Sequence, residues 1–178
     1  MTALAYVHDD GGRQAAGYQG TAGDCVVRAV AIATQQDYAT VYAALSDGMR
    51  AQRQTRGRHA ASARNGVSVK RKWFRDYMHS IGWRWVPTMG IGTGCRVHLV
   101  RDELPSGRLI VSLSKHYTAV IEGVIHDTFN PTERGTTIYP PNTSERIPTG
   151  AIWLDNGNGW AYCPDRCVYG YWQPLASE

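Results

Sequence analysis

The chain has 178 residues, a formal net charge of +4 and 43% hydrophobic residues, with six Trp and ten Tyr. That length fits one domain, and the aromatic content indicates a packed core with aromatic-lined clefts rather than a disordered tail. No apolar run approaches the roughly 20 residues of a membrane-spanning helix. Residues 1–14 also lack the apolar stretch of a secretion signal. The sequence therefore predicts a protein of the cytoplasm with no membrane partner.

Positive charge is concentrated between Gly48 and Arg75, a stretch with nine Arg and Lys residues and no Asp or Glu. Because the whole chain carries +4, the remainder has a net charge of about −5. The simplest interpretation is a solvated, flexible basic loop over residues 54–66 beside a charged helix face. Two alternatives stay open. The loop could bind the phosphates of a nucleic acid. Alternatively, it could border a cleft and select acidic substrate residues. The arginines that would do so are Arg56, Arg58 and Arg64.

Helical patterns occupy the first half of the chain, after an irregular, Gly-rich segment over residues 1–24. Helices are predicted at residues 25–34, 37 to about 53, and 68–81. The first is apolar on nearly every side and should be buried centrally. Asp37 and Ser68 can cap the second and third helices, and Gly82 ends the third.

Runs of β-branched and aromatic residues follow in the second half. They predict strands at residues 83–86, 108–113, 116–121, 124–127, 152–154 and 167–172. Residues 97–104 fit a short helix and residues 132–150 a loop. Helices first and antiparallel strands later are typical of an α+β domain. We expect one domain over residues 1–178, with a helical part at about 25–82 and a sheet part at about 83–178.

Cys25 is the strongest candidate for a reactive residue. It follows the Gly-broken segment 19–24 and begins the first predicted helix, whose N-terminus carries about half a positive charge and so favours a thiolate. Its backbone N–H and the side-chain amide of Gln19 could stabilise an oxyanion. Asp24 directly precedes it, and this negative charge would oppose a thiolate unless the carboxylate caps the helix. An inert buried thiol is the alternative.

His116 and Asp127 are the candidate partners of the cysteine. If Glu122-Gly123 forms a two-residue turn, Thr118 lies opposite Asp127 in the hairpin. Side chains alternate along strands, so His116 and Asp127 then share one face as diagonal neighbours, roughly 7–8 Å apart between backbones. His126 should point to the opposite face, which argues against it as a base. A surface histidine and a turn aspartate are the alternatives. The pattern predicts Cys25 as nucleophile, His116 as base and Asp127 as orienting acid.

The remaining cysteines allow a rival site. Cys95 with His98, and Cys163 with Cys167, have spacings acceptable for zinc. The two pairs lie far apart in the chain, so ordinary buried thiols are favoured over zinc. A Cys163–Cys167 disulfide is disfavoured in the cytoplasm. Four cysteines are too few for a disulfide framework at this length, and in a reducing compartment they should be thiols. No metal or organic cofactor is therefore expected.

Gln19-x5-Cys25 at a helix start, followed by His116 and Asp127 on successive strands, resembles the papain-like cysteine peptidase superfamily. The strand His116–Gly123 is similar to the His-aromatic-x-Ala/Val-Val-x-x-Gly strand of bacteriocin-leader peptidases. This resemblance implies a papain-like fold, in which a central helix carrying Cys25 packs on an antiparallel sheet, and the same three roles. Val26 stands where papain has an aromatic residue. The chain also resembles proteins of phages and prophages in residues 24–29, 82–90 and 167–172.

Together these features predict a papain-like thiol hydrolase that cleaves an amide or related acyl bond in a protein or peptide through a Cys25 thioester. Deamidation, removal of a conjugated protein and transamidation use the same groups and stay open. The alternative is a catalytically inactive, phage-derived protein in the host cytoplasm. It would bind a host protein or nucleic acid through its basic loop.

Overall fold

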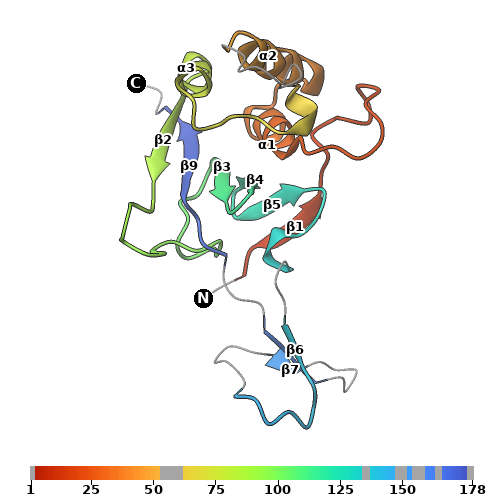
Figure 1. The fold of residues 1–178 in the computed structure, drawn as a ribbon, viewed down its shortest axis with the longest axis vertical. Helices are drawn as coiled ribbons and strands as arrows, with labels where there is room; N and C mark the ends of the chain where they lie inside the picture. Colours follow the sequence, from red (N-terminus) through yellow and green to blue (C-terminus); the bar gives the residue numbers. More distant parts are fainter. Residues whose placement is uncertain are drawn as a thin grey trace.

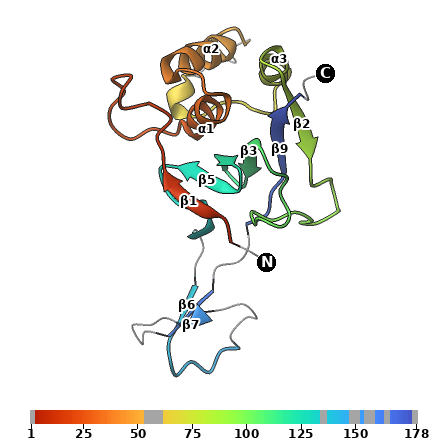
Figure 2. The same ribbon diagram turned by 180° about the vertical axis from the view of Figure 1, so that it is seen from behind.

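The computed structural model describes residues 3–52, 62–133, 137–146, 152–153, 159–162 and 166–175. Three helices lie on one face of a six-stranded sheet, which makes this an α+β fold (Figure 1). A smaller three-stranded sheet lies apart from the larger one in both views (Figures 1 and 2). Among the described residues, no helix has the length and apolar character needed to cross a membrane.

The large sheet is mixed. β1 runs parallel to β5, and every other neighbouring pair is antiparallel. In spatial order its strands are β1 (Ala5–His8), β5 (Val124–Asp127), β4 (His116–Ile121), β3 (Arg108–Leu113), β9 (Gly170–Pro174) and β2 (Trp83–Pro87). The small sheet has the order β6 (Thr137–Tyr139), β8 (Trp160–Tyr162) and β7 (Ile152–Trp153).

The helices are α1 (Cys25–Thr34), α2 (Tyr38–Arg50) and α3 (Lys72–Ser80). Seven of the ten residues of α1 are buried, so this helix is the centre of the core. Its C-terminus is tied to the sheet by Arg108 of β3, which donates hydrogen bonds to the carbonyls of Ile32 and Ala33 at 2.7 and 2.6 Å. A cation at a helix C-terminus complements the helix dipole and satisfies carbonyls that lack helical partners.

Apolar side chains cover both faces of the large sheet. Ile110 and Ala119 pack on the helices, whereas Leu109, Val111 and Val120 belong to a second buried cluster. Adjacent residues of a strand point to opposite faces, which explains why β3 and β4 are apolar almost throughout. The sheet is therefore a rigid base for groups at its ends.

Several elements match the sequence-based predictions. The bounds of α1, β3, β4 and β5 are confirmed, and Asp37 caps α2 by accepting a hydrogen bond from the Thr40 N–H at 2.9 Å. The prediction for α3 was wrong at its start. The helix begins at Lys72 rather than Ser68, because residues 67–71 form turns in which the Val69 and Arg71 amides bond to nearby carbonyls.

Other elements differ more. Residues 5–8, expected to be irregular, form β1, and residues 137–139 form β6 within the predicted loop. Residues 97–104 form turns instead of a helix, because backbone bonds of Val97 and Leu99 join this segment to residues 166–168. The predicted last strand begins at Gly170 instead of Cys167.

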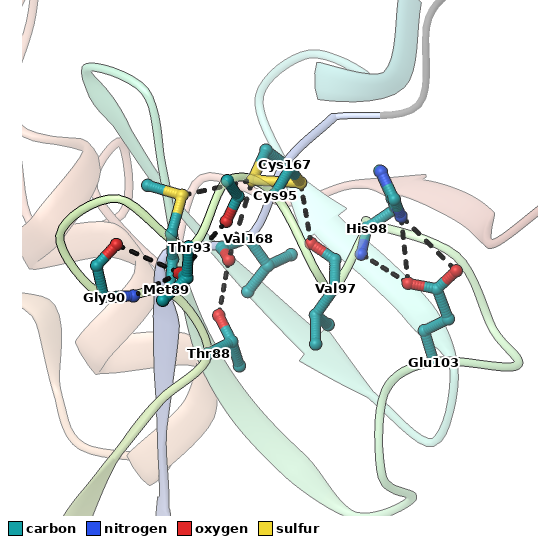
Figure 3. Close-up of a disulfide and its surroundings, with 11 residues drawn as sticks. Thr88, Met89, Gly90, Thr93, Cys95, Val97, His98, Glu103, Cys167 and Val168 are labelled. Atoms are coloured by element: carbon teal, nitrogen blue, oxygen red, sulfur yellow. Dashed lines mark hydrogen bonds and ion pairs between the residues drawn. A yellow bond between two sulfur atoms is a disulfide. The ribbon is translucent and has the colours of Figure 1, made fainter.

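Cys95 and Cys167 form a disulfide across 72 residues of sequence, with a Cα–Cα distance of 5.7 Å (Figure 3). The expectation that these two cysteines are thiols was therefore wrong. A backbone bridge between His98 and Cys167 brings the two segments together, a long-range contact that residue spacing does not reveal. Such bonds are typical of oxidising compartments.

Reduction of this disulfide is expected to lower the free energy of unfolding by about 2–4 kcal/mol, because the bond closes a long loop in the unfolded chain. Urea denaturation with and without a phosphine reductant measures the change. A Cys95→Ala/Cys167→Ala double variant should already have the lower value and should not respond to the reductant. Equal midpoints for the native chain in both conditions would contradict the expectation.

Candidate active site

The β4–β5 hairpin fixes the register of the candidate base and acid. Glu122 and Gly123 have φ values of 48° and 77°, the left-handed conformation that a two-residue hairpin turn of type I′ requires at both central positions. The paired residues include Ala119 with His126 and Ile121 with Val124. The predicted turn and register are thereby confirmed.

His116 begins β4 and Asp127 ends β5, at the same end of the hairpin. The His116 Nε2 and Asp127 Oδ2 atoms are 2.6 Å apart, and both side chains are buried. The other carboxylate oxygen of Asp127 accepts a hydrogen bond from the Thr128 N–H at 2.7 Å. The His116 ring also packs on the Phe129 ring, with a centroid distance of 4.8 Å. These contacts hold the imidazole in one orientation.

β1 supports this acid from the edge of the sheet, a role that sequence reasoning missed. The backbone carbonyl of Asp127 accepts hydrogen bonds from the Asp9 N–H at 2.8 Å and from the Tyr6 hydroxyl at 3.2 Å. His8 lies opposite Asp127 in the parallel pair. The end of β5 is therefore held on its outer side as well as by β4.

Cys25 begins α1, is half-buried, and is the one free cysteine among the described residues. The His116 side chain and the backbone N–H of Tyr117 lie near its sulfur and lower the pKa of the thiol. Because Asp127 occupies Nε2 of His116, Nδ1 is the nitrogen that remains for the sulfur. The structure thus brings together all three residues that the sequence singled out.

The electrostatics favour a thiolate beside an imidazolium. Burial raises the pKa of the Cys25 thiol. The nearby His116 imidazole, the Tyr117 N–H and the charge of Arg28 outweigh burial, and the pKa is lowered overall. Burial likewise lowers the pKa of His116, but its hydrogen bonds to Asp127 and Cys25 outweigh that effect and raise it. Opposite shifts in two adjacent groups stabilise the ion pair.

Asp24 does not cap α1. Its side chain makes no capping hydrogen bond; it is buried, accepts hydrogen bonds from Arg13, Arg28 and the Tyr38 hydroxyl, and pairs with both arginines. The two guanidinium groups compensate the negative charge next to Cys25, so the expected conflict with a thiolate is resolved without a cap. Sequence reasoning missed Arg13, which lies eleven residues earlier.

The loop before Cys25 is held by arginines. The carbonyl of Gln19 accepts hydrogen bonds from Arg13 at 3.1 Å and Arg64 at 3.4 Å, and Arg64 also reaches the Thr21 carbonyl at 3.3 Å. The carbonyl of Arg64 in turn accepts the Gly23 N–H at 2.8 Å. Arg64, predicted as a substrate-binding residue, thus contacts the loop of the nucleophile itself.

The two predicted oxyanion donors are the Gln19 side chain and the backbone N–H of Cys25. The Gln19 side chain lies on an exposed loop, and its role stays a prediction. The backbone N–H of Cys25 has no acceptor within the helix, as at every helix start, so it is free of helical hydrogen bonding. Arg56 and Arg58 lie outside the described residues.

The rival zinc site does not assemble from the described residues. Cys95 and Cys167 are bonded to each other, which removes two thiolate ligands. Nδ1 of His98 lies 3.0 Å from Glu103 (Figure 3). Cys163 lies outside the described residues, among which no group of three or more potential ligands could hold a metal ion.

Comparisons with known proteins return no match: no family model, no curated protein and no solved structure is significantly similar to this chain. The functional interpretation therefore depends on the site itself.

Proposed function

We propose that this protein is a papain-like cysteine hydrolase acting on amide bonds of protein or peptide substrates. The observation that carries the proposal is the arrangement of Cys25, His116 and Asp127, with 2.6 Å between the imidazole and the carboxylate and with the imidazole close enough to the sulfur to lower the pKa of the thiol. A nucleophile, a base and an orienting acid in this order define the geometry of thiol hydrolases on unrelated folds.

In the proposed reaction, the Cys25 thiolate attacks the carbonyl carbon of the substrate, and the carbonyl electrons move to oxygen. The Cys25 N–H, with Gln19 as a further donor, stabilises the oxyanion. The carbon–nitrogen bond then breaks, and the proton on His116 passes to the leaving amine, which yields a thioester. Water attacks this thioester while His116 takes its proton. The acid product leaves, and the thiolate–imidazolium pair is restored. Asp127 orients the imidazole throughout.

The proposal predicts selective alkylation of Cys25 by iodoacetamide between pH 5 and 9. Because the pKa of Cys25 is lowered, the rate should stay high below about pH 8.5, where an ordinary thiol becomes protonated. The rate should fall only when the pH drops through the lowered pKa of Cys25. Hydrolysis should also decline as the pH rises through the raised pKa of His116, since the leaving amine then loses its proton donor.

Peptide mapping of the alkylated protein measures the rate at each cysteine separately. Cys25→Ser should abolish the fast phase without changing the alkylation rates of the other cysteines. A Cys25 rate that follows an ordinary thiol titration, no faster than Cys163, would identify an inert thiol and contradict the proposed hydrolase.

A further inference from the structure

A large pocket opens beside the candidate active site. Its volume is about 690 Å³, and it is lined by Val69, Lys70, Arg75, Trp85, Met89, Ser112, Tyr117, Tyr169 and Trp172. This size lies within the range of ligand-binding clefts. The residues come from the segment before α3, from α3 itself, and from strands β2, β3, β4 and β9 with their adjoining loops. The pocket therefore depends on the assembled fold.

Tyr117 connects the pocket to the nucleophile. Its side chain lines the pocket together with that of Ser112, its cross-strand partner. Its backbone N–H is one of the groups that lower the pKa of Cys25, and it directly follows His116 in β4. The pocket wall thus includes the residue that follows the candidate base.

The accessible aromatic rings of the lining are those of Trp85, Tyr117 and Tyr169. Trp85 is paired with Trp172 across β2 and β9, with ring centroids 5.4 Å apart, and Trp172 itself is only 2% exposed. A β-carbon on Gly170 would lie only 2.2 Å from the Trp85 ring, so the glycine leaves room for that indole. Tyr169 is partly exposed at the pocket. Flat aromatic walls favour an aromatic guest.

The two charged side chains of the described lining, those of Lys70 and Arg75, are both positive. Lys70 and Arg75 are both exposed, and Arg75 donates a hydrogen bond to the carbonyl of Lys70 at 3.4 Å. Among the described residues that line the pocket, none is a carboxylate. An acidic group on the guest would therefore meet two cations and no opposing anion.

We infer that this pocket selects the substrate of the proposed hydrolase by binding an aromatic side chain that has a carboxylate-bearing residue next to it. The inference rests on the proposed function for its biological meaning, but the binding itself can be measured without catalysis. The aromatic walls would contact the aromatic ring of the substrate, and Lys70 and Arg75 would bind its carboxylate.

Binding is tested on the full chain carrying Cys25→Ser, with fluorescein-labelled peptides and fluorescence anisotropy. The peptides present Phe-Glu or Glu-Phe within glycine flanks, and matched versions replace Phe by Ala or Glu by Lys. Loss of the ring should weaken binding about tenfold or more. Reversal of the charge should weaken it about fivefold at low salt, and less at high salt.

Two sets of variants assign these effects to the pocket. Tyr169→Ala should reduce the preference for Phe over Ala. Lys70→Gln/Arg75→Gln should remove the preference for Glu over Lys, whereas the control Arg50→Gln/Lys72→Gln should keep it. The control removes the same charge from exposed positions outside the lining. Equal affinities for all peptides, or equal effects of the two double variants, would overturn the inference.

A labelled oligo-dT tests the competing occupant. If it binds more tightly than every peptide and depends on Lys70 and Arg75, the pocket binds nucleic acid and the inference is wrong. Iodoacetamide alkylation of the native chain separates the two proposals. Normal Cys25 reactivity without peptide discrimination overturns the pocket assignment alone. Peptide discrimination with an unreactive Cys25 supports the pocket and overturns the hydrolase.

Discussion

Replacement of His116 by Ala is expected to slow the alkylation of Cys25 at pH 6 by about tenfold to a hundredfold. The imidazole is the main group that lowers the pKa of the thiol against the effect of burial. Without it, the pKa should return to the ordinary thiol range or rise above it. The thiolate then becomes a small fraction at pH 6. The loss is moderated because a more basic thiolate is a better nucleophile.

His126→Ala is a matched control from the same hairpin. His126 is paired with Ala119 on β4, and its Nδ1 lies 3.2 Å from an Asp9 carboxylate oxygen. The variant also loses an imidazole–carboxylate contact, which is longer and more exposed than that of His116 and does not involve the imidazole next to the sulfur. Alkylation rates and circular dichroism should be measured for both variants. If both slow the reaction equally while remaining folded, His116 has no special connection to the thiol.

The parts of the site that the sequence predicted depend on local rules. A two-residue turn at Glu122-Gly123 fixes which residues of β4 and β5 face each other, so the alignment of His116 with Asp127 follows from strand alternation. The apolar run after Cys25 similarly defines a central helix whose first residue lies at its positive end. Neither inference requires knowledge of distant contacts.

The missed features depend on contacts between distant segments. β1 is four residues long and largely exposed, and it exists because it pairs in parallel with β5 more than 110 residues later. Parallel pairing leaves no turn signal in the sequence. The disulfide similarly joins residues 72 positions apart. The pocket brings together residues from Val69 to Trp172, so its chemistry could not be read from any one segment.

Asp24→Asn is expected to lower the free energy of unfolding by about 3–5 kcal/mol. The substitution keeps the shape of the side chain but removes a charge that pairs with Arg13 and Arg28. Those side chains are only 14% and 12% exposed, and Asp24 only 1%. Two cations would then lie largely buried without their anion, and water could solvate them only in part.

Urea denaturation measures the loss, with Asp76→Asn as the control. Asp76 pairs with Lys72 at the surface, where the two side chains are 57% and 86% exposed, and breaking such a pair should cost less than about 1 kcal/mol. Equal costs for the two variants would contradict a buried network. An Asp24→Asn/Arg28→Met double variant should recover part of the stability, because it removes one of the stranded cations.

The alkylation rate of folded Asp24→Asn protein reveals which role the carboxylate has. If Asp24 only supports the start of α1, removal of its negative charge next to Cys25 should leave the thiolate equally or more favoured. Alkylation at pH 6 should then be undiminished although the protein is less stable. A slower reaction would mean that the Arg13–Asp24–Arg28 network also positions the sulfur against His116. Stability and reactivity measured on one variant therefore distinguish support of the helix from alignment of the nucleophile.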